Sequence, residues 1–130
     1  MNSYVYTKDV IASVDQVLQK LRSKLDNSGF SILNQIEIGD ILNEKLGLEY
    51  HRYVVLSIWN AVKMQQALEI QENIGLFMPF TIVVYESLNG SVISMAKPTL
   101  VFNLIDDRDL REIAHFIESK VTEVIDTLLL

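Results

Sequence analysis

The chain contains no cysteine among its 130 residues, and this absence excludes several kinds of chemistry. Disulfide bonds, thiol nucleophiles, iron–sulfur clusters and thiolate zinc sites all require cysteine sulfur. The two histidines, His51 and His115, lie far apart in the sequence without the spacing of metal ligands. A glycine-rich phosphate loop is also missing. We therefore expect no metal and no cofactor.

Runs of basic residues and long apolar runs are missing as well. The formal net charge is −6 and the isoelectric point is about 4.8. Because such a chain repels phosphate backbones, a nucleic-acid partner is not expected. No apolar run reaches the length of a membrane span, and the first ten residues lack the features of a signal peptide. These absences predict a cytoplasmic protein without a membrane partner.

Proline and glycine are scarce, at 2 and 5 residues, and none of them belongs to a linker. The length fits one domain over residues 1–130, and a hydrophobic share of 49% is enough for a globular core. Two segments have the apolar periodicity of an amphipathic helix. The first starts with a Ser13–Gln16 capping box and stops at Gly29. The second runs to the end of the chain and has Asp106 or Asp107 as its cap.

The remaining segments predict strands separated by shorter helices. The β-rich or alternating stretches are residues 3–7, 30–38, 50–59 and 81–95, the last of which forms a hairpin. In the second stretch, Ile32 and Ile36 are expected on one face. The order βαβαβαββα predicts an α+β two-layer sandwich, with a mixed, largely antiparallel sheet and helices on one face.

The hairpin contains Asn89-Gly90, a dipeptide typical of a two-residue type I′ turn. This turn would pair Leu88 with Ser91 and place Glu86 opposite Ile93. The register is a prediction that the strand pairing tests directly.

Four segments together resemble a known family. They are SGF at 28–30, EKLG at 44–47, IGLFMPFTIVVYE at 74–86 and MAKPT at 95–99. In their order and spacing the chain is similar, over nearly its whole length, to the domain of unknown function 302 family, DUF302. The resemblance implies a small two-layer α+β domain, found mostly in bacteria and archaea, and it implies no established activity.

The chain departs from this family where members commonly carry cysteine. Trp59-Asn60-Ala61 stands in place of Cys-Asn-Pro, and Pro79-Phe80 stands in place of Pro-Cys. Any thiol chemistry of the relatives is therefore unavailable to this chain.

Glu86, Lys45 and Asn60 are the candidate ligand-binding residues. Glu86 follows Val84 on the apolar face of its strand, so it is either a desolvated general base or a strand-end residue that reaches water. Lys45 is its candidate partner if the 40–47 helix packs over the hairpin. Asn60 precedes a helix, and an N-cap role explains it without a ligand.

Two classes of function remain open. The first is a non-catalytic small-ligand-binding or interaction domain, and the second is a small acid/base enzyme using Glu86 with Lys45. Ser57 and Ser94 lack the context of a nucleophile. The sequence does not indicate a set of catalytic side chains that would meet at one place. It therefore favours the first class over an enzyme.

The second face of the predicted sheet is unusually apolar. Every helical stripe is assigned to the first face, so nothing in the chain is left to cover the second. Its expected residues are Tyr53, Val55, Ser57, Trp59, Val83 and Tyr85, joined by Val92 and Leu33, with Phe116 at the flank. Tyrosine and tryptophan are enriched in interfaces, so we expect a two-fold homodimer through this face. The alternative is a solvated face with scattered tyrosines.

Overall fold

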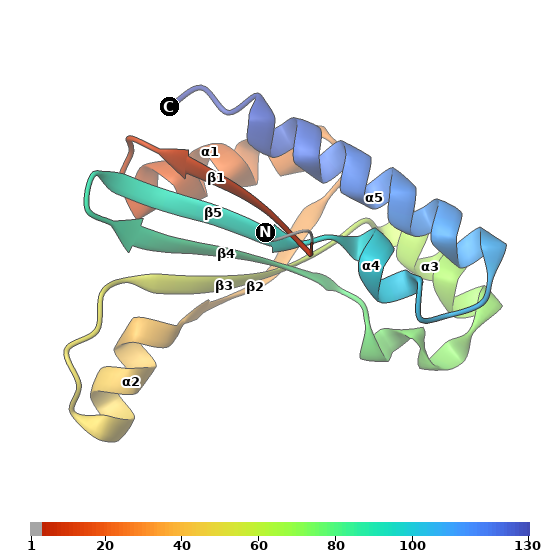
Figure 1. Cartoon of the computed structure of the whole chain (residues 1–130), viewed down its shortest axis with the longest axis horizontal. Helices are drawn as coiled ribbons and strands as arrows, with labels where there is room; N and C mark the ends of the chain where they lie inside the picture. Colours follow the sequence, from red (N-terminus) through yellow and green to blue (C-terminus); the bar gives the residue numbers. More distant parts are fainter. Residues whose placement is uncertain (1–3) are drawn as a thin grey trace.

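A computed structural model describes residues 4–130 and shows one five-stranded sheet with its helices (Figure 1). The elements are β1 (Val5–Val10), α1 (Val14–Asn27), β2 (Ser31–Glu37), α2 (Ile38–Leu46), β3 (Tyr53–Trp59), α3 (Ala61–Ile70), η1 (Glu72–Leu76), β4 (Phe80–Ser87), β5 (Gly90–Ala96), α4 (Pro98–Phe102) and α5 (Arg108–Asp126). The predicted α+β class and element order are confirmed, with η1 and α4 as additions. Ser3, where the first strand was expected to begin, lies outside the described residues.

The strands follow the spatial order β1-β5-β4-β3-β2, and every described pair is antiparallel. The two edge strands are therefore β1 and β2. Alternation along β3 buries Val54, Leu56 and Ile58, while the residues between them remain partly exposed.

Helices α1 and α5 cover one face of the sheet (Figure 1). The Ser13–Gln16 capping box begins α1, and Asp107 rather than Asp106 caps α5 by accepting a hydrogen bond from the Leu110 N–H at 2.9 Å. The core between the two layers is apolar, and its largest fully buried side chains are Phe30, Phe102, Leu21, Leu25, Leu56, Ile58, Ile74, Ile82, Ile93, Met95, Leu110 and Ile117.

Helix α2 is an exception to the expected placement of the helices. It follows the end of β2 and lies on the side of the sheet opposite α1 and α5 (Figure 1). Gly39 is its one buried residue. The assignment of every helical stripe to the first face was therefore wrong for α2.

The predicted hairpin exists, but its predicted register was wrong by two residues. Ser87 pairs with Gly90, so Glu86 lies opposite Ser91 and not opposite Ile93. Gly90 is the first residue of β5, and a Cβ there would lie 2.1 Å from the carbonyl oxygen of Val10. The glycine is required for this close approach and not for the turn, which moves to residues 88–89. A shift of two residues leaves every side chain on its predicted face.

A bulge in β2 overturns the expected alternation of that strand. Ile32 pairs with Ile58, but Asn34 pairs with Ser57, so Leu33 is an extra residue in the ladder. Because of this extra residue, the side chains of β2 after Leu33 point to the opposite face from the one that simple alternation predicts. Ile32 therefore packs against the core while Ile36 turns to the other face.

The short helix α4 was missed, although Pro98 at its first turn is a recognised start signal. Thr99 donates hydrogen bonds to Glu118 Oε1 from its backbone N–H, at 3.1 Å, and from its hydroxyl, at 2.7 Å. These contacts fix the start of α4 against α5.

Leu21→Ala and Ile117→Ala test whether the α1 and α5 stripes form the core. Both side chains are 0% exposed, so each substitution should lower the free energy of unfolding by about 2–5 kcal/mol. Denaturant melts measure this loss, with the exposed Leu129→Ala as the control. Losses below about 1 kcal/mol at Leu21 and Ile117 would contradict the packing described.

Candidate functional site

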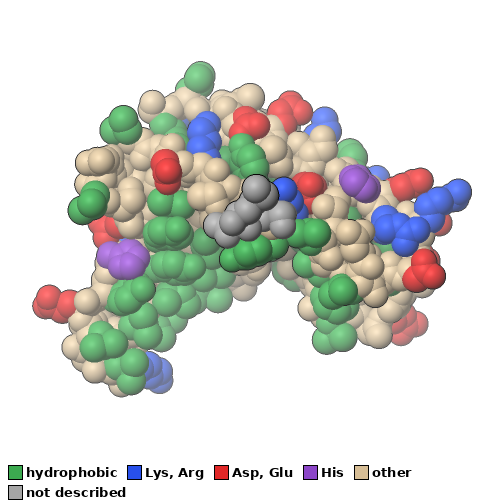
Figure 2. Space-filling view, in the orientation of Figure 1, with side chains coloured by type: hydrophobic (Ala, Val, Ile, Leu, Met, Phe, Trp, Pro, Cys, Tyr) green, Lys and Arg blue, Asp and Glu red, His purple; other side chains and the backbone are tan. Residues whose placement is uncertain are grey.

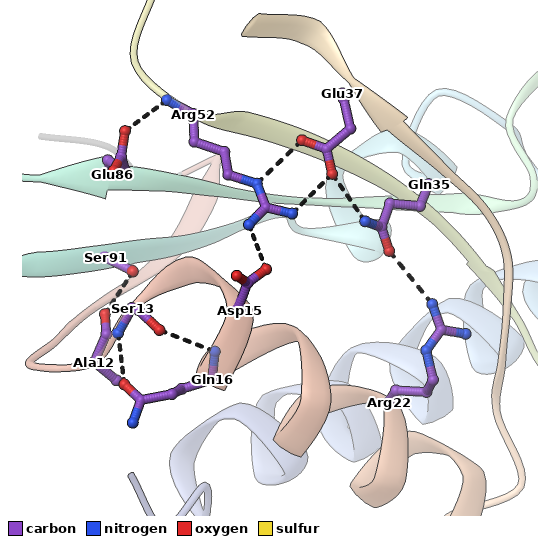
Figure 3. A network of polar contacts seen from close by, with 10 residues as sticks. All are labelled: Ala12, Ser13, Asp15, Gln16, Arg22, Gln35, Glu37, Arg52, Glu86 and Ser91. Atoms are coloured by element: carbon purple, nitrogen blue, oxygen red, sulfur yellow. Dashed lines mark hydrogen bonds and ion pairs between the residues drawn. The ribbon is translucent and has the colours of Figure 1, made fainter. Parts of the chain in front are cut away.

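The side chain of Arg52 lies at the centre of a polar network at one end of the sheet (Figure 3). Its Nε donates to Glu37 Oε1 at 3.1 Å and its Nη2 donates to Glu37 Oε2 at 2.9 Å. Its Nη1 donates to Asp15 Oδ1. The guanidinium thus joins the segment before β3 to the end of β2 and to the first turn of α1.

Two further side chains extend this network along the edge strand. Gln35 Nε2 donates to Glu37 Oε2 at 2.9 Å, and Arg22 Nη2 donates to Gln35 Oε1 at 3.4 Å. Because Gln35 and Glu37 lie on β2 and Arg22 lies on α1, the network attaches the edge strand to the helix layer.

The network also determines the charge state of its members. Hydrogen bonds from Arg52 hold the pKa of Glu37 below its ordinary value, although partial burial acts in the opposite direction. Contacts with Glu37 first and Asp15 second raise the pKa of Arg52 above its ordinary value. Glu37 is therefore ionised near neutral pH and bonded at both oxygens, which suits a structural role better than proton transfer.

Glu86 is joined to the network through the backbone of Arg52. Its Oε1 accepts a hydrogen bond from the Arg52 N–H at 2.7 Å, and its own N–H donates to the Arg52 carbonyl at 3.0 Å. The side chain is exposed at the end of β4. The Glu86 side chain thus helps to hold the backbone just before β3 against the end of β4. The carboxylate itself remains exposed to water.

Lys45 and Asn60 lie elsewhere. Lys45 is exposed on α2, which packs mainly against β3, and within residues 4–130 no hydrogen bond or ion pair joins it to Glu86. Asn60 caps α3, and its Oδ1 accepts from the Lys63 N–H at 3.0 Å. The structure therefore does not bring the three predicted residues together.

The open face, as we name the side of the sheet away from α1 and α5, carries the second candidate site. It comprises Val5, Thr7 and Asp9 of β1, Ser31, Asn34 and Ile36 of β2, Tyr53, Val55, Ser57 and Trp59 of β3, Thr81, Val83 and Tyr85 of β4, and Val92, Ser94 and Ala96 of β5. Leu33, expected here, is the half-exposed bulge residue of β2. The expectation that Phe116 adds to this face was wrong, because α5 covers the other face and the Phe116 ring lies beneath Lys63 of α3, with Nζ 4.5 Å from the ring centroid.

Aromatic rings gather at the end of the open face beside α2. Tyr53 and Tyr85 stack with centroids 5.2 Å apart, and His51 meets both of them edge-on. Tyr50 stacks on His51 at 4.3 Å. The sequence identified the tyrosines of the strands, but it gave no sign that residues 50 and 51 join them.

The open face is concave, and apolar side chains line much of it. Figure 2 shows hydrophobic side chains along the underside of the molecule, which is hollowed between α2 at lower left and the η1 region at lower right. Two clefts lie at other places, one of about 410 Å³ at the ends of α1 and α5 and one of about 580 Å³ beside the β4–β5 turn. Neither cleft is lined by Glu86 or Lys45.

In the described part of the chain, no group of three or more histidine or acidic side chains is arranged to hold a metal ion. None of the helices within residues 4–130 combines the length and the apolar character needed to cross a membrane.

Comparisons with known proteins agree with this architecture. A family model described as "Domain of unknown function DUF302" matches residues 6–128. The chain belongs to the DUF302 family. A crystal structure of an uncharacterized conserved DUF302 protein from Bacillus stearothermophilus is 30% identical, with a TM-score of 0.90 over 98% of this chain and 99% of that one. Comparison with curated proteins returned no match.

The structure shows where the aromatic replacements of the expected DUF302 cysteines lie. Ile58 pairs with Phe80, so Trp59 and Phe80 lie at the same end of neighbouring strands. Phe80 points into the core, whereas Trp59 lies on the open face. Side chains at these two positions therefore point to opposite faces of the sheet.

Glu86→Gln should leave the fold intact. The Gln side chain keeps a carbonyl oxygen that accepts the Arg52 N–H, and water solvates the rest of the exposed amide. A thermal melt should therefore shift by no more than about 2 °C. A much larger loss would show that the charge of Glu86 is itself structural.

Glu37→Gln should reduce stability in a pH-dependent way. The pKa of Glu37 is lowered in the folded chain, so its contribution is present above the ordinary value of 4.5 and is lost as the pH falls through the lowered pKa. Denaturant melts at a series of pH values should show the mutant less stable at pH 7 and the difference vanishing in acid. Glu112→Gln, at an exposed position of α5, is the control. A pH-independent difference would contradict the role given to the Arg52–Glu37 pair.

Proposed function

We propose that the chain is a non-catalytic interaction domain that forms a homodimer through its open face. One observation carries this proposal: the open face is concave, it carries partly exposed apolar side chains on β3 and β4 such as Val55, Val83 and Tyr85, and α1 and α5 leave it uncovered (Figure 2). Monomers rarely expose a contiguous apolar patch above a few hundred Å². A second copy would remove this surface from water.

The distribution of charge supports the choice of a second copy as partner. The chain carries a net charge of −6, so two copies come together most easily through surfaces that are nearly neutral, where no like charges are brought into contact. Among the outward-facing positions of the described strands, Asp9 at the β1 edge is the one charged residue. An open face built for a basic or acidic partner would carry complementary charges instead.

The remaining candidate functions have less support. An acid/base enzyme using Glu86 with Lys45 needs both groups within reach of one substrate, but Glu86 bonds the Arg52 backbone and Lys45 lies on α2. A small-ligand site usually buries most of the ligand surface, whereas the clefts of about 410 and 580 Å³ are wide open to solvent.

Sedimentation of the unmutated chain and of the Tyr85→Asp, Val55→Asp double variant tests the dimer. The unmutated chain should sediment as a dimer at micromolar concentration. The double variant should sediment as a monomer because it places four carboxylates in the interface. Ile11→Asp with Leu129→Asp is the matched control, since both residues are at least 85% exposed outside the open face. Circular dichroism checks that each variant folds.

Two results would contradict the proposal. A monomeric unmutated chain at micromolar concentration would exclude the dimer. A dimer that the double variant leaves intact would place the interface elsewhere. Native mass spectrometry of freshly purified protein would show a co-purifying small molecule as added mass on a monomer, which would favour the ligand-binding alternative.

A further inference from the structure

Helix α2 exposes apolar side chains that the chain itself does not cover. Leu46 is 65% exposed and Ile41 is 40% exposed, while Gly39 is the one buried residue of the helix. Leu48, just beyond the end of α2, is 51% exposed. Tyr50, in the segment that returns from α2 to β3, is also half-exposed. An amphipathic helix normally buries its apolar side against the rest of the protein. In the single chain these apolar side chains remain in contact with water instead.

The position of α2 is fixed despite this exposure. A Cβ at Gly39 would lie 2.7 Å from the carbonyl oxygen of His51, so the first turn of α2 is in close contact with the backbone before β3. At the other end, Asn43 Nδ2 donates to the Leu48 carbonyl at 3.1 Å. The first contact places the start of α2 against the segment before β3, and the second holds the loop after α2 to the helix. The helix thus projects beyond the open face, on the side away from α1 and α5 (Figure 1).

The area of the open face indicates what this projection does. Five strands about 4.8 Å apart, with about seven residues each at roughly 3.3 Å per residue, span about 550 Å². A stable protein interface covers about 800 Å² on each partner. The flat area of the strands is below this value, so an apolar helix beside them would enlarge the surface available for contact.

We propose that α2 is an arm that packs its apolar residues against the second copy of the chain. This inference rests on the proposed dimer and names the element that completes its interface. In a two-fold dimer each arm contacts the other copy, so every contact made by Leu46 occurs twice.

Thiol labelling of Leu46→Cys tests the arm directly, because the chain has no other cysteine. The full chain is treated with a maleimide at concentrations above and below the midpoint of dimer dissociation. The thiol should react about tenfold or more slowly in the dimer. Leu129→Cys, on the helix side and 85% exposed, should react at the same rate at both concentrations.

A second variant measures the energetic contribution of the arm. Leu46→Asp should raise the dissociation constant of the dimer by about tenfold or more, whereas Leu129→Asp should leave it unchanged. Because Leu46 is largely exposed in the single chain, neither change should disturb the fold.

The outcomes separate this inference from the proposed function. A chain that never dimerises overturns both. A dimer that the open-face double variant disrupts, but in which the Leu46→Cys thiol reacts as fast as in the monomer, overturns the arm and leaves the dimer. Slow labelling at every concentration would mean that α2 is covered by its own chain, which also overturns the arm.

Discussion

Strand alternation gives the sheet one apolar face and one partly apolar face, and α1 and α5 cover only the first. Val54, Leu56 and Ile58 of β3 are fully buried beneath these helices. Tyr53 and Val55 project the opposite way from the same strand and meet no helix of comparable length. The uncovered side is where α2 projects and where the aromatic rings gather.

The parts of the fold that the sequence predicts are those that local patterns determine. The α1 and α5 stripes, the Ser13 cap and the Asn60 cap all depend on residues within one or two turns. The hairpin register does not, because Gly90 is placed by its contact with Val10 in another strand. The bulge at Leu33 likewise has no local signature, although it reverses the face of Ile36.

The candidate site was less predictable than the fold for the same reason. Arg52 contacts Glu37 and Asp15, which lie 15 and 37 residues away, and composition does not indicate which charges meet across such separations. Glu86 was correctly placed at a strand end, yet its hydrogen bond to the Arg52 backbone follows from the pairing of β3 with β4. A carboxylate on an apolar face here stabilises a strand start, which explains its position without catalysis.

The central claim, that the open face is buried against a second copy, has a natural reporter in Trp59. It is the one tryptophan of the chain and lies on the open face, half-buried. Its fluorescence is recorded with acrylamide as quencher while the unmutated protein is diluted through the range in which sedimentation shows dissociation. The account predicts that dilution shifts the emission to longer wavelength and increases quenching. Emission and quenching that stay constant while the dimer dissociates would contradict it.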